Sequence, residues 1–234
     1  GVAGGWGGSA AVARAHPLPP HDPSFAQCGE DLIVLYIFNE LGVPKPTYID
    51  IGAYHPYTIN NTYLLYTRGC RGLLIEPNVD MTAVLKKERP HDTTLAIGIG
   101  LSSATEADYY RMSEPSWNTF DKDMAEHYVK VTNGEKKLLQ VVKVPLVNIN
   151  EVIDKHHGGK TPDFFSVDVE GLELDILKSL DWSKHRPKVI CVETLVAGTR
   201  RQKLECVEFL ATKNYVVRGS SFVNTILVDN ALLG

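Results

Sequence analysis

The stretch YIDIGAYHP, residues 48–56, has the composition of a buried strand that ends at a glycine. Its apolar residues flank Asp50, and Gly52 lets the backbone turn sharply or approach a ligand closely. Similar apolar runs, such as GLLIE at 72–76 and FFSVDV at 164–169, recur with helical stretches between them. Continuous apolar runs are typical of strands that are buried on both faces of a parallel sheet. The pattern predicts an α/β fold in which helices cover both faces of a mostly parallel sheet.

The predicted elements alternate along the chain after a first helix that ends at Gly42. Strands are expected at 47–53, 71–76, 93–99, 140–147, 164–169 and 187–193, and helices at 58–68, 79–88, 149–156, 172–180 and 200–213. The C-terminal stretch YVVRGSSFVNTILVD contains two β-rich runs around Gly219. This stretch predicts that the sheet closes with an antiparallel hairpin.

The composition limits the class of protein. The chain has 234 residues, 44% of them hydrophobic, and a formal net charge of -4, with no basic stripe, which argues against nucleic acid as a partner. No apolar stretch approaches the roughly 20 residues that span a membrane. The four cysteines have neither CxxC nor zinc-site spacing, and two lie in apolar segments. We therefore expect reduced thiols and a cytoplasmic location.

The chain divides into three parts by composition. Residues 1–21 are rich in glycine, alanine and proline, and we expect a flexible tail or an expression remnant. Residues 22–234 are expected to form one domain. Within that domain, residues 101–139 form an insertion beside the sheet, which is either a lid over a substrate or a solvent-facing excursion.

Four predicted strands end in acidic residues, namely Asp50, Glu76, Asp168 and Glu193. Ligands of open parallel sheets bind at the carboxyl ends of the strands, near the point where the strand order reverses. Glu76 could accept both hydroxyls of a ribose there, and Asp50 could receive a cationic group. The first loop lacks the GxGxxG pattern of a dinucleotide site. S-adenosylmethionine is a nucleoside without a pyrophosphate, so it fits both the acids at positions 50 and 76 and the missing GxGxxG pattern. The alternative is that the two acids only cap βα turns.

The segment DVEG contains the strongest candidates for catalysis. Asp168 and Glu170 project to the same side of a strand, and such a pair persists if it shares a proton, binds a cation or pairs with a base. We expect Asp168 to be catalytic. Asp168, Glu170 and Glu193 are also the candidate ligands of a divalent metal such as Mg²⁺. Glu193 could instead hold the acceptor, or it could simply be a polar residue at a strand end. Glu173 is explained more simply as a first-turn acid that interacts with the helix dipole.

Three further residues could serve an acceptor molecule. His55 has a side chain suited to deprotonating a hydroxyl, although a histidine before proline is as often structural. Trp117 and Asn118, in the stretch SWNTF, offer a flat face and an amide for a sugar ring or an adenine. Trp117 could instead anchor the insertion.

Four segments resemble the FkbM family of methyltransferases: FAQCGEDLIVLYIF, YIDIGAYHPYTINNTYLLYTRGCRGLLIEPN, SWNTF and FFSVDVEGLELDILKSLDWSKHRPKVICVET. The resemblance covers residues 24–195, and DVEGxE together with IEPN is its most diagnostic part. It implies a class I, Rossmann-like methyltransferase with a seven-stranded sheet whose last strand is antiparallel. It also implies transfer of a methyl group to a hydroxyl, often of a sugar or a glycosylated metabolite. His55 and Pro56 stand where many members have a second glycine.

The resemblance also implies which residues surround the cofactor. The methionine half would contact Asp50, Gly52 and Tyr54. The ribose would contact Glu76 in the IEPN segment, which also contains Asn78. The QxGED segment would bring Gln27 and Glu30 to the same pocket. From the residues alone, Glu30 is equally well explained as a first-turn acid that interacts with the helix dipole.

The predicted reaction moves a methyl group from S-adenosylmethionine to an oxygen that the protein holds in line with it. Deprotonation of that oxygen would be assisted by His55, by an acidic residue or by a metal. Two alternatives remain open: a nicotinamide-dependent oxidoreductase, and a methyltransferase-like module that binds the cofactor without turnover.

Overall fold

The structure, a computed structural model of the chain, describes residues 23–169, 171–196 and 199–234. The helices are α1 (Glu30–Glu40), α2 (Tyr63–Thr67), α3 (Val79–Glu88), α4 (Lys122–Val131), α5 (Ile149–His156), α6 (Glu173–Ser179) and α7 (Glu205–Thr212), with 3₁₀ turns η1 (Pro115–Trp117) and η2 (Asn230–Leu232). The strands are β1 (Tyr48–Ile51), β2 (Gly72–Ile75), β3 (Thr93–Leu95), β4 (Gly98–Ile99), β5 (Glu106–Met112), β6 (Leu138–Val147), β7 (Phe164–Val167), β8 (Val189–Glu193), β9 (Tyr215–Ser220) and β10 (Asn224–Asp229). The predicted tail and Glu170 lie outside the described residues.

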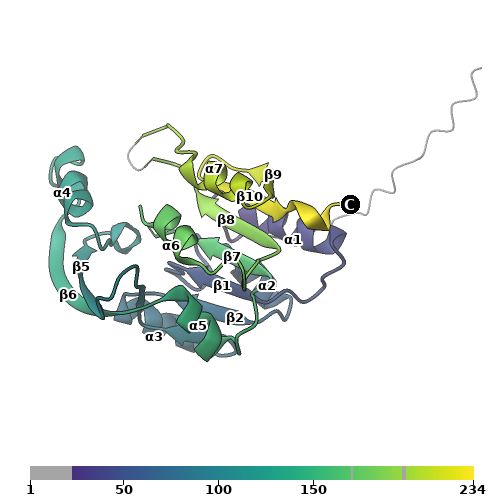
Figure 1. Cartoon of the computed structure of the whole chain (residues 1–234). Helices are drawn as coiled ribbons and strands as arrows, with labels where there is room; N and C mark the ends of the chain where they lie inside the picture. The colour runs from purple at the N-terminus through teal and green to yellow at the C-terminus, as the bar shows by residue number, and fades with distance from the viewer. Residues whose placement is uncertain (1–22, 170, 197–198) are drawn as a thin grey trace, which may run out of the picture.

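Seven strands form the main sheet, in the order β3-β2-β1-β7-β8-β10-β9 (Figure 1). Strands β3, β2, β1, β7 and β8 are parallel, whereas β10 is antiparallel to both β8 and β9. The predicted α/β fold, with its mostly parallel sheet and C-terminal antiparallel hairpin, is confirmed. The strand order reverses between β1 and β7, so a ligand site is expected at the carboxyl ends of these two strands.

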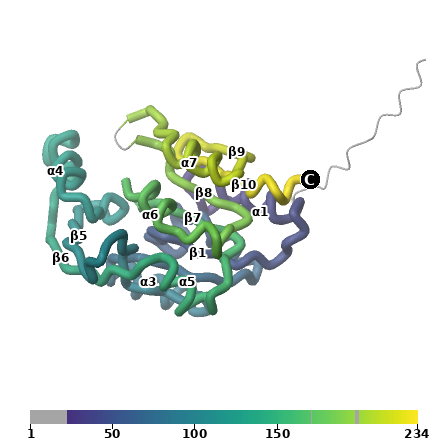
Figure 2. Tube along the Cα trace, viewed as in Figure 1, coloured from purple at the N-terminus to yellow at the C-terminus, as the bar shows by residue number. Residues whose placement is uncertain are grey.

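Helices cover both faces of the sheet, as predicted. One face packs against α5, α6 and α7 through a core that includes Ile51, Val167 and Leu177. The other face packs against α1, α2 and α3 through a core that includes Phe38 and Phe164. Side chains alternate between the two cores because successive residues of a strand point to opposite faces. Figure 2 traces the course of the chain in the same view, with α1, α3, α5, α6 and α7 labelled around the strands.

A second, smaller sheet with the order β4-β6-β5 stands beside the main one. The prediction of a single strand at 93–99 is wrong. This stretch forms two strands, β3 in the main sheet and β4 in the small sheet. At Gly98, a Cβ would lie 2.5 Å from the Phe120 ring and 2.9 Å from Leu146, so the chain packs tightly against the small sheet at this bend. The strand predicted at 140–147 exists as β6 but belongs to the small sheet.

The predicted insertion, residues 101–139, consists mainly of β5, η1 and α4 (hereafter the excursion). Figure 1 shows α4 and β5 at the side of the molecule opposite to α1. Two helices are shorter than predicted: α2 begins at Tyr63, and α7 begins at Glu205. No helix in the described part of the chain is long and apolar enough to cross a membrane.

Candidate active site

A cavity of about 390 Å³ lies at the carboxyl ends of β1, β2, β7 and β8, where the strand order reverses. Cavities of this size at this position are typical small-molecule sites. One wall consists of residues at the strand ends: Gly52, Glu76, Asp168, Val169 and Glu193. The opposite wall comes from the excursion: Tyr109, Pro115, Ser116, Trp117, Asn118, Thr119, Phe120 and Tyr128. We call these the strand-end wall and the excursion wall.

Gly52 determines how closely the loop after β1, which we call the first loop, approaches the end of β7. It has a φ of 84°, and a Cβ at this position would lie 1.8 Å from the carbonyl oxygen of Asp168. The N–H of Asp168 in turn donates to the carbonyl of Ile51 at 3.0 Å. Only glycine combines this backbone conformation with the absence of a side chain. The close approach of the two strand ends therefore depends on a glycine at position 52.

Glu76 presents a fixed carboxylate to the cavity. The residue is 5% exposed, and its two oxygens accept the N–H groups of Tyr54 at 2.9 Å and Asn78 at 2.7 Å. Burial, together with the charge of Asp50, raises the pKa of Glu76 to about 7, against the lowering effect of the two backbone donors. Each carboxylate oxygen can accept a second hydrogen bond, so both remain able to bind a ligand hydroxyl.

Asp50 does not line the cavity, although the sequence predicted a direct contact with the cofactor. Its carboxylate accepts the hydroxyl of Thr62 at 2.7 Å and the side-chain amide of Asn60 at 3.3 Å. Asn60 Nδ2 also donates to the carbonyl of Ala53, and buried Arg89 donates to both Thr62 and Asn60. Asp50 lies one residue before the end of β1, so its side chain points into the helical layer. Asp50 therefore stabilises the first loop through Asn60, which bonds the carbonyl of Ala53.

His55 also lies outside the residues that line the cavity. Its Nδ1 accepts the N–H groups of Tyr57 at 3.4 Å and Thr58 at 3.2 Å, and burial lowers its pKa. This arrangement corresponds to the structural alternative, in which the imidazole holds the turn after β1. The neighbouring Tyr54, with a φ of 50°, does line the cavity.

The other residues predicted to bind the cofactor lie in three different environments. Gln27 lines the cavity. Asn78 is the N-cap of α3, where its side chain accepts the N–H of Asp80 at 3.1 Å. Glu30 is fully buried and accepts a hydrogen bond from Asn224 Nδ2 at 3.1 Å, which ties α1 to the C-terminal hairpin. Of these three, only Gln27 can contact a ligand in the cavity.

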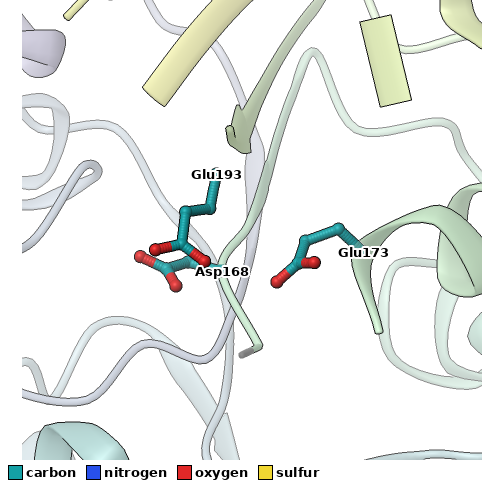
Figure 3. Close-up of side chains that lie close together, drawn as sticks. All are labelled: Asp168, Glu173 and Glu193. Atoms are coloured by element: carbon teal, nitrogen blue, oxygen red, sulfur yellow. The ribbon is translucent and has the colours of Figure 1, made fainter. Parts of the chain in front are cut away.

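Three carboxylates gather where β7 and β8 end. Oxygens of Asp168, Glu173 and Glu193 lie within 4.8 Å of one another. Figure 3 shows the Asp168 and Glu193 carboxylates facing each other, with Glu173 pointing toward them from α6. The structure brings Asp168 and Glu193 together as the sequence predicted, whereas Glu170 lies outside the described residues. Glu173 joins the cluster although the sequence indicated only an interaction with the helix dipole.

Glu173, in this acidic cluster, is held by two backbone donors and by an ammonium group. Its Oε1 accepts the N–H groups of Val169 at 3.2 Å and Gly171 at 3.0 Å, which closes the turn into α6. Its Oε2 lies 3.0 Å from the ammonium of Lys203, which is also 4.0 Å from a Glu193 oxygen. Burial would lower the pKa of Lys203, but these carboxylates raise it overall, so the side chain is charged at neutral pH.

Trp117 and Asn118 line the excursion wall. The Trp117 ring lies 4.7 Å from the Tyr128 ring, and Lys136 lies 5.4 Å from its centroid. Asn118 Oδ1 accepts the N–H of Met112 at 2.7 Å, so the orientation of the amide is fixed. The bond from Met112 uses only Oδ1 and does not involve the Nδ2 donor of Asn118.

Sequence reasoning missed Lys203 entirely. It is 30 residues from Glu173 in the chain, and no local motif links the two. Its N–H donates to the carbonyl of Thr194 at 2.7 Å, and Leu195 and Gln202 form an isolated bridge, so the segment after β8 folds back toward the strand end. Only this tertiary contact shows that a lysine belongs to the site.

Comparison with curated protein sequences gave no match. Among solved structures, the chain is similar to a TehB-like SAM-dependent methyltransferase from Corynebacterium glutamicum, with 10% identity and a TM-score of 0.43, over 87% of this chain and 88% of that chain. It is also similar to monomeric WbdD, with 14% identity and a TM-score of 0.45, over 86% of this chain and 40% of that chain. The family assignment rests instead on a sequence match.

Residues 50–217, more than half of the chain, match the family described as the methyltransferase FkbM domain. The matched range includes the strand ends that carry Glu76, Asp168 and Glu193, and it also includes the excursion. The resemblance noted from the sequence motifs is thereby confirmed. The chain belongs to the FkbM methyltransferase family and is an S-adenosylmethionine-dependent methyltransferase.

Proposed function

We propose that the protein is an O-methyltransferase whose acceptor is a hydroxyl of a sugar or of a glycosylated metabolite. The observation that carries this proposal is that one cavity joins three features. These are the fixed carboxylate of Glu76, the acidic cluster at the ends of β7 and β8, and the aromatic excursion wall. The first suits the cofactor, and the other two suit an acceptor.

The strand-end wall fits S-adenosylmethionine, which supplies a methyl group bound to a positively charged sulfur. Glu76 would accept the ribose hydroxyls, because its orientation is fixed by two backbone donors and its oxygens retain acceptor capacity. Gly52, Tyr54 and Gln27 line the same cavity and would contact the rest of the cofactor. Asp50 would act indirectly, because its contacts with Asn60 and Thr62 hold the loop that carries Tyr54.

Asp168 would hold the acceptor hydroxyl and take up its proton. It lines the cavity beside Glu193, and a carboxylate within hydrogen-bonding distance of a hydroxyl can act as its general base. Trp117, Tyr109 and Tyr128 would pack against the apolar face of a sugar ring, as aromatic residues commonly do in small-molecule sites. These contacts would align the oxygen with the methyl group, which lowers the entropic part of the barrier.

A divalent metal would be a second way to activate the hydroxyl, and the mutual distances within the acidic cluster favour it. The residues as placed do not fit this role. Glu173 uses one oxygen for two backbone donors and the other for Lys203, whose ammonium is also near Glu193. The proposed reaction therefore uses no metal.

The experiment that tests the function combines calorimetry with a transfer assay. Titration with S-adenosylhomocysteine should show binding, whereas NAD should show none. Incubation with labelled S-adenosylmethionine and a panel of sugars, glycosides and other hydroxyl compounds should label at least one acceptor on oxygen. Binding of S-adenosylhomocysteine without transfer to any member of the panel would favour the inactive binding module instead.

A further inference from the structure

The acidic cluster brings three carboxylates together in a partly enclosed site, which requires a compensating positive charge. Glu193 is 8% exposed and Glu173 is 2% exposed, so water screens them poorly. Divalent cations often supply such a charge, because their oxygen ligands lie at about 2.0–2.6 Å and therefore within a few ångströms of one another. Here, however, a lysine is already in position.

Lys203 is held in this position by its own backbone. Its N–H donates to the carbonyl of Thr194, directly after β8, and α7 begins two residues later. Its side chain is about one quarter exposed, and the ammonium lies 3.0 Å from Glu173 and 4.0 Å from Glu193. The ammonium thus lies between the end of β8 and the first turn of α6.

We propose that Lys203 is the built-in cation of the acidic cluster and that it takes the place of a divalent metal. It is a positioning residue: it orients Glu173, which closes the turn after Asp168, and Glu193, which faces Asp168. Removal of the ammonium leaves three carboxylates whose oxygens lie within 4.8 Å of one another, an arrangement that binds divalent cations. The wild-type protein therefore does not bind such cations at this site, and a variant without Lys203 does.

The test is a thermal-unfolding titration of the full chain without cofactor or acceptor. Mn²⁺, Mg²⁺ and Ca²⁺ are each added at constant ionic strength to the wild type, K203M, K203R and K155M. K155M is the matched control, because Lys155 pairs with Glu151 at 2.9 Å on the surface of α5, away from the cavity. A cation that binds the folded state raises Tm, by about 3–6 °C for this size of protein at roughly ten times its Kd.

The expected result is a saturable rise in Tm for K203M alone. Wild type, K203R and K155M should show no response, because each retains a cation in the acidic cluster. A saturable response of the wild type that D168N abolishes overturns the proposal, and so does a K203M variant that folds without responding. Should K203M not fold, K203Q replaces it, and the wild-type measurement remains decisive by itself.

If the proposed function is correct, methyl transfer by the wild type should not need a divalent metal. Turnover in the presence of EDTA measures this. EDTA should leave wild-type turnover unchanged, and inhibition that added Mn²⁺ reverses would contradict the role of Lys203. The thermal titration needs neither cofactor nor acceptor. A failure to find any methyl acceptor would therefore count against the proposed function and leave the assignment of Lys203 standing.

Discussion

The two walls of the cavity differ in how they are built. The strand-end wall belongs to the main sheet; its Glu76 and Glu193 are buried, and two backbone donors hold Glu76. The excursion wall rests on a small separate core of Met112, Ala125 and Tyr128. Leu139, on the strand that supports it, is 66% exposed. The difference indicates a division of labour: the main sheet provides a preformed cofactor site, and the excursion adapts the protein to its acceptor.

The largest effect is expected at Asp168, which lies on the strand-end wall but acts on the acceptor. It therefore tests the division between the two walls most severely. We expect Asp168→Asn to lower turnover about 10²–10⁴-fold, the usual contribution of one acid–base group, and to leave the affinity for S-adenosylhomocysteine nearly unchanged. Single-turnover kinetics and calorimetry separate the two effects. D175N, on the exposed side of α6, is the control. Near-normal turnover in D168N would remove Asp168 from the reaction.

Gly52→Ala should damage the strand-end wall itself. The positive φ costs about 1–2 kcal/mol for a residue with a Cβ, and the 1.8 Å contact with the Asp168 carbonyl adds roughly 1–3 kcal/mol. Urea unfolding should show a loss of about 2–5 kcal/mol in the free energy of unfolding. Gly134→Ala, in the excursion, is the matched control: its φ is 79° and nothing lies within 4 Å of the added Cβ. Equal losses in the two variants would contradict the close approach at Gly52.

Glu76→Ala tests the cofactor site alone. Loss of charge-assisted hydrogen bonds should cost about 1.5–3 kcal/mol of binding, which raises the Kd for S-adenosylhomocysteine roughly 10- to 150-fold. E88A, at the exposed end of α3, should bind normally. If E76A is folded and its Kd matches that of the wild type, the ribose does not contact Glu76.

Trp117→Ala tests the excursion wall. Loss of an aromatic contact of about 0.5–1.5 kcal/mol should raise the KM for the acceptor roughly 2- to 13-fold, with the Kd for S-adenosylhomocysteine unchanged. W117F should recover most of the loss. A rise in the Kd instead of the KM would assign Trp117 to the adenine and would contradict the division between the walls.

A last prediction concerns the pH dependence of stability at Glu76. The folded protein holds the proton on this carboxyl with a pKa of about 7, above its ordinary value of 4.5. The folded state therefore binds more protons than the unfolded chain between these values, and Glu76 contributes less stability as the pH rises through this window. The Tm of the wild type relative to E76Q should fall between pH 4.5 and 7. Parallel curves for the two proteins would show that the pKa is not raised.

The strand-end wall was largely predictable from the sequence, for a physical reason. Apolar runs reveal buried parallel strands, and the residue after each run must lie at the edge where ligands bind. This logic placed Glu76, Asp168 and Glu193 at the cavity. It did not extend to Asp50, which is inside β1 rather than after it, so strand alternation turns the side chain toward Thr62 and Asn60.

The rest of the site depends on contacts between distant segments. Lys203 reaches Glu173 only because the chain after β8 folds back, and no local pattern encodes that path. The split between β3 and β4 has the same origin. Both strands lie in the single β-prone stretch TTLAIGI, residues 93–99, and only the packing of Gly98 against Phe120 shows that the second strand belongs to another sheet.

A crystal structure of the full chain with S-adenosylhomocysteine bound is the decisive measurement for the division between the two walls. We expect the ribose hydroxyls to lie within hydrogen-bonding distance of the Glu76 carboxylate. We also expect the sulfur to face the space between Asp168 and Trp117. A ribose that contacts neither oxygen of Glu76, or a sulfur that faces away from Asp168, would contradict this division.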